Sequence, residues 1–254
     1  MKAIFRNKIS FILILIALIN FSCSTLNTVN GIKSMRNGRL NLSHSHLTEI
    51  PDYVFEMKGL KILNLHDNDI TEIPAEIVKL TSLEKLIISR NKLKTVPPEI
   101  GQLINLKKLS LKANRITSLP EEISGLKNLQ ELFLNFNLLT YLPNSIGDLE
   151  NLSHLYLDYN QIEYLPNEIG KLSNLEHLVI GRNNLQILPI TFYELTQLII
   201  LDLSYSGPLL KIENEICNFR RLETLYIDVA TLNFAPRCLE IRANSLQRFS
   251  IIIK

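Results

Sequence analysis

Aliphatic residues recur along this chain in one pattern, L-x-x-L-x-L-x-x-N-x-L, which the segment from Leu129 to Leu139 shows in full. The pattern restarts every 23 residues, with its first leucine at Leu60, Leu83, Leu106, Leu129, Leu152, Leu175 and Leu198. In each copy, positions four and six face one side of a short strand, and position five faces the other side. A repeat of this length predicts a solenoid whose coils hide their leucines by stacking on one another.

Position nine of the pattern is asparagine in six consecutive copies. We expect this residue to bend the chain while its amide pairs with backbone groups that the turn buries. Stacked from coil to coil, these side chains predict an internal asparagine ladder, formed by Asn68, Asn91, Asn114, Asn137, Asn160 and Asn183.

The second half of each copy also repeats, with a proline followed three positions later by an inward-facing apolar residue, as in Pro143 and Ile146. Proline fixes φ and lacks a donor, so it suits the first turn of a short 3₁₀ or α-helical segment. We therefore expect such turns on the side opposite the strands. The first unit, 37–59, has Asn37 and Ser45 at the leucine and asparagine positions, which predicts a degenerate cap.

These spacings resemble those of the leucine-rich repeat family from about residue 37 to the end of the chain. The resemblance implies an α/β fold, a curved leucine-rich-repeat solenoid of about ten repeats with a parallel β-sheet on the concave side and 3₁₀ or short helical turns on the convex side. It also implies a non-catalytic binding protein. The 23-residue form is similar to repeats of intracellular signalling scaffolds and of exported bacterial proteins, so the repeat alone leaves the compartment open.

The N-terminus lies outside the repeat pattern. Lys2, Arg6 and Lys8 precede an apolar run that is too short to span a membrane comfortably, which predicts a signal peptide over residues 1–22. The run ends in N-F-S-C, which resembles a bacterial lipobox with Cys23 as the lipid acceptor, although its asparagine and phenylalanine depart from that motif. An ordinary leader is the alternative. Residues 23–36 then read as a tether.

If Cys23 is acylated, the protein is expected in the bacterial cell envelope, anchored to the membrane at the outer membrane or cell surface, or secreted. The remainder, residues 37–254, is expected to form a single repeat domain, because 46% hydrophobic residues and no Trp suit one elongated aliphatic core. A net charge of +2 gives no strong field, and we expect no nucleic-acid partner.

No P-loop, G-x-S-x-G, H-E-x-x-H, C-x-x-C or dinucleotide motif occurs in the sequence, so we expect neither an enzyme nor a cofactor. His44, His66 and Asp67 occupy neighbouring coils and could approach a metal ion. Solvated side chains on an exposed strand are the favoured interpretation, and we expect no metal site.

The candidate binding site is the outward face of the strands, where aromatic residues cluster on a scaffold whose core is already filled by leucines. We call this cluster the aromatic patch: Phe133, Phe136, Tyr156, Tyr159, Val179 and Tyr205. Exposed apolar patches of this kind mark protein interaction sites. The alternative is that the rings stack on one another and bind nothing.

Charged residues flank the aromatic patch. A basic zone comprises Lys85, Arg90, Lys108 and Lys112, and an acidic stripe comprises Asp158, Asp202 and Asp228. His154 and His177 share one outward position on adjacent coils, which would make binding sensitive to pH. Mixed charge favours a protein ligand, and the resemblance to exported repeat proteins suggests a host surface molecule. An envelope glycan or glycosaminoglycan on Lys108 and Lys112, and an intracellular scaffold role, are the rival functions.

Beyond Leu198 the period lengthens to 24 residues, and Ser206 and Ala230 replace the ladder asparagine. We expect a bulge at Gly207-Pro208. Cys217 and Cys238 lie in consecutive units on the convex side, where they could form a disulfide or remain buried thiols. The hydrophobic final strand, 249–253, could be a shielded cap or pair with a second copy, so the oligomeric state stays open.

Overall fold

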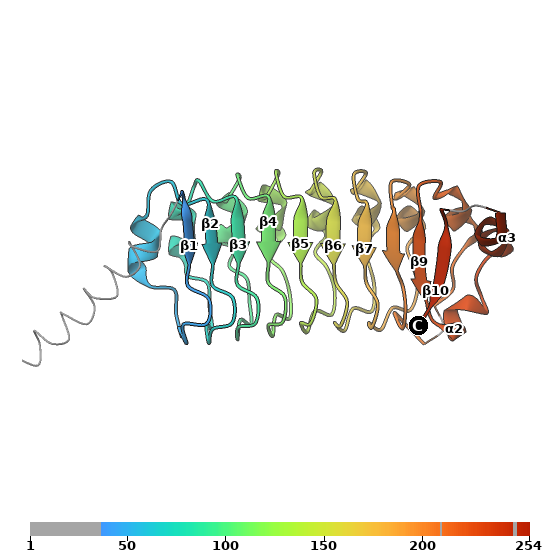
Figure 1. The fold of residues 1–254 in the computed structure, drawn as a ribbon, viewed down its shortest axis with the longest axis horizontal. Coiled ribbons are helices and arrows are strands. Elements are labelled where there is room, and N and C mark those ends of the chain that lie inside the picture. The colour runs from blue at the N-terminus through green and yellow to red at the C-terminus, as the bar shows by residue number, and fades with distance from the viewer. Residues whose placement is uncertain (1–36, 209, 246–247) are drawn as a thin grey trace, which may run out of the picture.

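The computed structural model describes residues 37–208, 210–245 and 248–254. The predicted signal peptide, the lipid acceptor Cys23 and the tether lie outside these residues. In the described part of the chain, ten strands form one parallel sheet in chain order (Figure 1). The strands are β1 (Arg39–Asn41), β2 (Ile62–Asn64), β3 (Lys85–Ile87), β4 (Lys108–Ser110), β5 (Glu131–Phe133), β6 (His154–Tyr156), β7 (His177–Val179), β8 (Ile200–Asp202), β9 (Thr224–Ile227) and β10 (Ser250–Ile253).

The register of the sheet follows the sequence period. Leu132 pairs with Leu155, and Leu155 pairs with Leu178, so equivalent leucines lie directly side by side. All three are fully buried. The predicted solenoid with a parallel sheet is therefore confirmed, because each coil covers the leucines of the next.

Short 3₁₀ helices return the chain behind the sheet (Figure 1). They are η1 (Asp52–Glu56), η2 (Ala75–Lys79), η3 (Pro98–Gln102), η4 (Glu121–Gly125), η5 (Asn144–Asp148), η6 (Asn167–Lys171), η7 (Ile190–Glu194) and η8 (Asn214–Asn218). Pro143 precedes η5 with φ −65°, and Ile146 inside it is fully buried. Coils stack so closely here that a Cβ on Gly147 would collide with the carbonyl oxygen of Glu168.

The asparagine ladder joins neighbouring coils through buried side chains. Asn137 donates from Nδ2 to the carbonyls of Leu111 (3.0 Å) and Leu134 (2.9 Å), and its Oδ1 accepts the backbone N–H of Ile116 at 3.0 Å. Asn68, Asn91, Asn114, Asn160 and Asn183 make matching bonds. Each amide therefore satisfies backbone groups that would otherwise be buried without partners.

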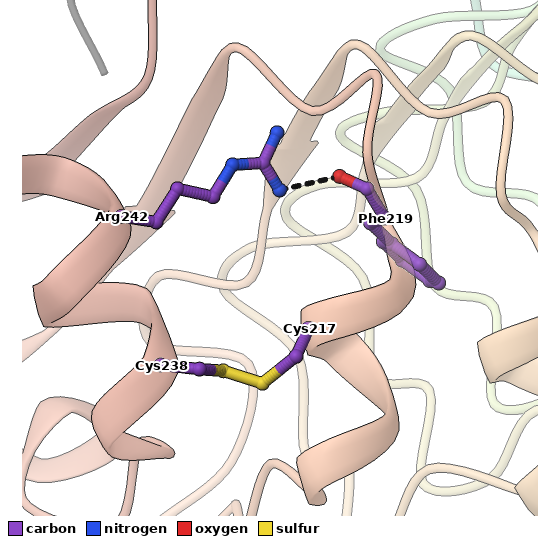
Figure 2. Close-up of a disulfide and its surroundings, with 4 residues drawn as sticks. All are labelled: Cys217, Phe219, Cys238 and Arg242. Atoms are coloured by element: carbon purple, nitrogen blue, oxygen red, sulfur yellow. Dashed lines mark hydrogen bonds between the residues drawn. A yellow bond between two sulfur atoms is a disulfide. The ribbon is translucent and has the colours of Figure 1, made fainter. Parts of the chain in front are cut away.

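At the C-terminal end the chain leaves the repeat geometry. The last coils carry the α-helices α2 (Val229–Leu232) and α3 (Arg237–Ser245), and α3 lies at the end of the solenoid farthest from β1 (Figure 1). A disulfide joins Cys217 in η8 to Cys238 in α3, with their Cα atoms 6.1 Å apart (Figure 2). The pairing that the sequence left open is thus present, and it holds α3 against the preceding coil.

The final strand β10 forms the edge of the sheet. Its Ile252 and Ile253 are 39% and 51% exposed. In the described residues, no helix is long and apolar enough to cross a membrane.

We predict that Asn137→Ala lowers the free energy of unfolding by about 3 kcal/mol, because it strands a buried N–H and two carbonyls. Asn128 provides the control: its Nδ2 also reaches the preceding coil, at Ile104, but the bond is exposed. Asn128→Ala should cost less than about 1 kcal/mol. Urea unfolding followed by circular dichroism measures both, and equal losses would show that burial of the amide is unimportant.

Candidate functional site

The outward face of the sheet, which we call the concave face, is built by the spacing of the strands. Parallel strands lie about 4.8 Å apart, so equal positions of successive coils form columns at the distance of stacked rings. Phe133 and Tyr156 stack with ring centres 4.7 Å apart and planes 5° from parallel. Phe136 and Tyr159 stack at 4.1 Å and 13°. The sheet thus holds two columns of aromatic rings in fixed positions.

Position eight, just after each strand, has a left-handed backbone. Phe136, Tyr159 and Tyr205 have φ of 58°, 57° and 55°, and the same conformation recurs at position eight of the other coils from His44 to Arg182. This region is unfavourable for bulky side chains. It projects these rings outward, and they remain 41%, 43% and 46% exposed despite the stacking.

Cations complete both columns. The Arg182 guanidinium lies 4.9 Å from the ring centres of both Tyr159 and Tyr205. Lys108 lies 4.4 Å from the ring centre of Phe133, and Lys112 lies 5.4 Å from that of Phe136. Arg182 thus bridges two rings, whereas Lys108 and Lys112 each cover one, and every cation adds a charged donor to an apolar surface.

The predicted stacking alternative therefore describes part of the aromatic patch. Phe133, Tyr156 and Val179 are half-buried rather than fully solvent-facing, because they cover one another along the strands. Position eight differs, since its rings are stacked and yet exposed. Of the predicted patch, Phe136, Tyr159 and Tyr205 are the side chains offered most fully to a ligand.

The charge pattern predicted around the patch needs correction. In the acidic stripe, Asp202 and Asp228 are buried: Asp202 pairs with Lys254 at 2.5 Å, and Asp228 accepts the N–H of Thr231 at 2.9 Å. In the basic zone, Lys108 pairs with Glu131 at 2.6 Å and Arg90 with Asp67 at 3.2 Å. Most of these charges are therefore engaged within the protein.

The surroundings also shift the pKa of one further carboxyl group, that of Asp158, and of one phenol, that of Tyr156. Burial raises the pKa of the Asp158 carboxyl. Burial also raises the pKa of Tyr156, and the carboxylates of Glu131 and Asp158 add to that effect. The Tyr156 hydroxyl thus stays protonated and able to donate a hydrogen bond.

His154 and His177 face each other on adjacent strands, with ring centres 4.2 Å apart. Burial lowers the pKa of His177, and repulsion from His154 lowers it further, against a smaller opposing effect of Glu176. The two histidines predicted to share one position therefore form a coupled pair beside the aromatic patch.

His44 and Asp67, considered above as metal ligands, make an exposed ion pair with 2.7 Å between Nδ1 and Oδ2. His66 instead reaches Ser89, at 3.1 Å. Within residues 37–208, 210–245 and 248–254, no group of three His, Cys, Asp or Glu side chains is arranged to hold a metal ion.

Sequence reasoning missed two features. Asn135 is buried between the two aromatic columns, and its Oδ1 accepts no hydrogen bond from any described residue. Arg220, Arg221, Arg242 and Arg248 gather around one hollow at the C-terminal end. The hollow could not be read from the period, because two of these arginines lie beyond the repeating coils.

Comparisons with known proteins agree with this architecture. A family model for leucine-rich repeats matches residues 38–93 and 104–162, and a model for two such repeats matches residues 81–125. A solved leucine-rich repeat protein of Leptospira interrogans is 32% identical, with a TM-score of 0.61, over 85% of this chain and 60% of that one. Comparison with curated proteins found no match.

Two further solved structures are similar. The ectodomain of the receptor kinase GASSHO1/SCHENGEN3 of Arabidopsis thaliana, in complex with CASPARIAN STRIP INTEGRITY FACTOR 2, is 31% identical over 70% of this chain and 22% of its own, with a TM-score of 0.65. An internalin of Listeria monocytogenes shares the fold at 22% identity, over 84% of this chain and 60% of its own, with a TM-score of 0.68. This chain thus spans 60% or less of each of these three.

We predict that His177 titrates below the ordinary histidine pKa of about 6.5. Because its folded pKa is lowered, it contributes stability above pH 6.5 that is lost as the pH falls through 6.5 toward the folded value. Replacing His154 with Gln should raise the pKa of His177 by removing a like charge. NMR titration of the ring protons measures this pKa, and an unchanged value in the variant would contradict coupling of the pair.

Proposed function

The chain belongs to the leucine-rich repeat family, and from that premise we propose that it is a non-catalytic binding protein that holds a protein or peptide ligand on its concave face. The observation that carries this proposal is the position-eight column: Phe136, Tyr159 and Tyr205 are exposed by more than two fifths on a rigid sheet. Rigid tyrosines make strong anchors, because they lose little conformational entropy on binding.

The column also sets the form of the ligand. Rings and cations follow one another across successive strands. A segment lying along the column would meet the rings of Phe136, Tyr159 and Tyr205, and the cations of Lys112 and Arg182 beside and between them. An extended peptide with apolar and acidic side chains matches that surface. The plant ectodomain solved with CASPARIAN STRIP INTEGRITY FACTOR 2 supports the use of this fold for holding a ligand.

A glycosaminoglycan on the basic zone is the weaker candidate. Lys108 and Arg90 already face carboxylates at 2.6 Å and 3.2 Å, so a polyanion would have to compete with Glu131 and Asp67. The remaining charge is small compared with the several unpaired cations that polyanion binding requires.

We also propose that the protein is exported to the bacterial cell envelope and anchored there through Cys23. The leader-like segment 1–22 and the lipobox-like N-F-S-C support this proposal. The Cys217–Cys238 disulfide adds an independent argument, because disulfides persist in oxidising compartments and are rare in the cytosol. The leader-like segment and the disulfide also argue against the rival role as an intracellular signalling scaffold.

Photo-crosslinking tests the concave face directly. A photoreactive phenylalanine analogue at position 136 should capture a protein from envelope or host-surface extracts. The Tyr156→Ala/Tyr159→Ala variant, carrying the same analogue at position 136, should recover at least about tenfold less of it. Tyr141 is 53% exposed and lies outside the patch, so the same analogue at position 141 is the matched control. Unchanged recovery by a folded double variant would exclude the aromatic patch as the site.

The anchor has a separate test. Metabolic labelling with a clickable fatty acid should mark the native protein, and Cys23→Ser should abolish the label and release the protein from the membrane fraction. Thiol labelling without reductant should leave Cys217 and Cys238 unmodified. Full-length protein in the cytosol, with both thiols free, would reject export.

A further inference from the structure

The four arginines that the repeat pattern does not predict line a hollow of about 380 Å³ at the edge where β8, β9 and β10 begin. They are Arg220, Arg221, Arg242 and Arg248. Leu222 and Phe249, both almost fully buried, form apolar parts of its wall. A volume of this size suits a small ligand or the end group of a larger one.

Arg242 is fixed in place by the fold. Its guanidinium donates to the backbone carbonyls of Phe219 (2.6 Å), Arg220 (2.8 Å) and Leu222 (2.9 Å), and it lies 4.7 Å from the ring centre of Phe249. Figure 2 shows Arg242 and Cys238 projecting from α3 toward the η8 coil, so the disulfide and the guanidinium anchor the same helix. Carbonyl oxygens satisfy its donors but do not neutralise its charge.

The other guanidiniums are poorly neutralised as well. Arg221 meets Glu176 at 3.6 Å and Gln197 at 2.7 Å. Among the described residues, Arg220, Arg242 and Arg248 take part in no ion pair, and Glu223 is the carboxylate that lines the hollow. Cations gathered around one hollow repel one another, and the apolar wall weakens the screening of that repulsion.

A bound anion would remove this repulsion. Guanidinium groups present planar forks of donors that match the oxygens of phosphate and sulfate, and they keep their charge at all physiological pH values. A dianionic oxyanion would satisfy several forks at once, whereas a single carboxylate would leave more of the positive charge unbalanced. The apolar wall leaves room for the uncharged body that carries the oxyanion.

We propose that this arginine hollow binds a phosphate or sulfate group, either free or as an ester on a small sugar-sized body. The site lies at the strand-start edge and is separate from the aromatic patch, so it gives the protein a second ligand class. Arg220 and Arg248 contact the oxyanion. Arg242 is held by three backbone carbonyls, so it fixes the wall of the hollow and adds positive potential inside it.

Calorimetry with inorganic phosphate, inorganic sulfate and glucose 6-phosphate tests this proposal at low ionic strength. We expect the three oxyanions to bind saturably and to compete with one another. Glucose, tested as the uncharged control, should not bind. Arg220→Gln/Arg248→Gln should weaken binding at least about tenfold, because each lost guanidinium removes charge-assisted hydrogen bonds. Tighter binding of glucose 6-phosphate than of inorganic phosphate identifies an ester ligand, and equal binding identifies the free oxyanion.

Arg115→Gln/Lys171→Gln is the control, since it removes the same two charges from exposed positions away from the hollow. This variant should bind within about twofold of the original protein, because neither Arg115 nor Lys171 lines the hollow, so neither can donate to an anion held there. Absence of saturable binding by any oxyanion would overturn the proposal. So would equal weakening in both double variants, which would show only a general effect of net charge.

Discussion

The fixed spacing of hydrogen-bonded parallel strands, about 4.8 Å, controls almost every other feature of this protein. It places Leu132, Leu155 and Leu178 side by side, which closes the core between neighbouring coils. The same spacing lets the Asn137 amide reach backbone groups of the preceding coil within the interior. It also matches the distance at which aromatic rings stack, so a column of Phe and Tyr on the concave face becomes a continuous surface. Core, ladder and aromatic column are therefore three consequences of one repeat distance.

The aromatic column combines an unfavourable backbone conformation with favourable stacking of its rings. A left-handed φ costs a bulky residue about 1 kcal/mol or more, and Phe136 and Tyr159 both have this conformation. Stacking at 4.1 Å can stabilise the pair by a similar free energy, which offsets the cost of the left-handed backbone. Their exposed faces are then available without any rearrangement of the backbone. The turn also keeps its inter-coil bonds, since the N–H of Phe136 donates to the backbone carbonyl of Asp158 at 2.9 Å. Rigid presentation follows from the hydrogen bonding of the turn rather than from the rings alone.

The periodic part of the fold could be predicted from the sequence, because every repeat carries the same residue types at the same positions. Leucine or isoleucine at positions four and six, asparagine at nine, and proline before η1 to η7 leave little choice of register. Exposure was harder to predict, because it depends on neighbours across the sheet: Tyr156 is covered by Phe133, and Asp202 by Lys254. The arginine hollow could not be predicted at all. Arg220 and Arg242 belong to different coils, and their approach depends on an α-helix that breaks the period.

The end of the repeat explains why the unusual chemistry gathers there. Ser206 and Ala230 replace the ladder asparagine, and Asp228 takes over part of its role by accepting the N–H of Tyr205 at 2.7 Å. Burial alone would raise the pKa of Asp228, but hydrogen bonds from Thr231 and Tyr205 hold it below its ordinary value, so the group remains a charged acceptor. The same carboxylate caps α2, which turns the chain out of the coil and toward α3. Once the chain is released from the 23-residue geometry, α3 can carry Cys238 and Arg242 against η8, positions that no regular coil provides. The coils without the ladder asparagine are thus followed by the helix that supplies Cys238 to the disulfide and Arg242 to the arginine hollow.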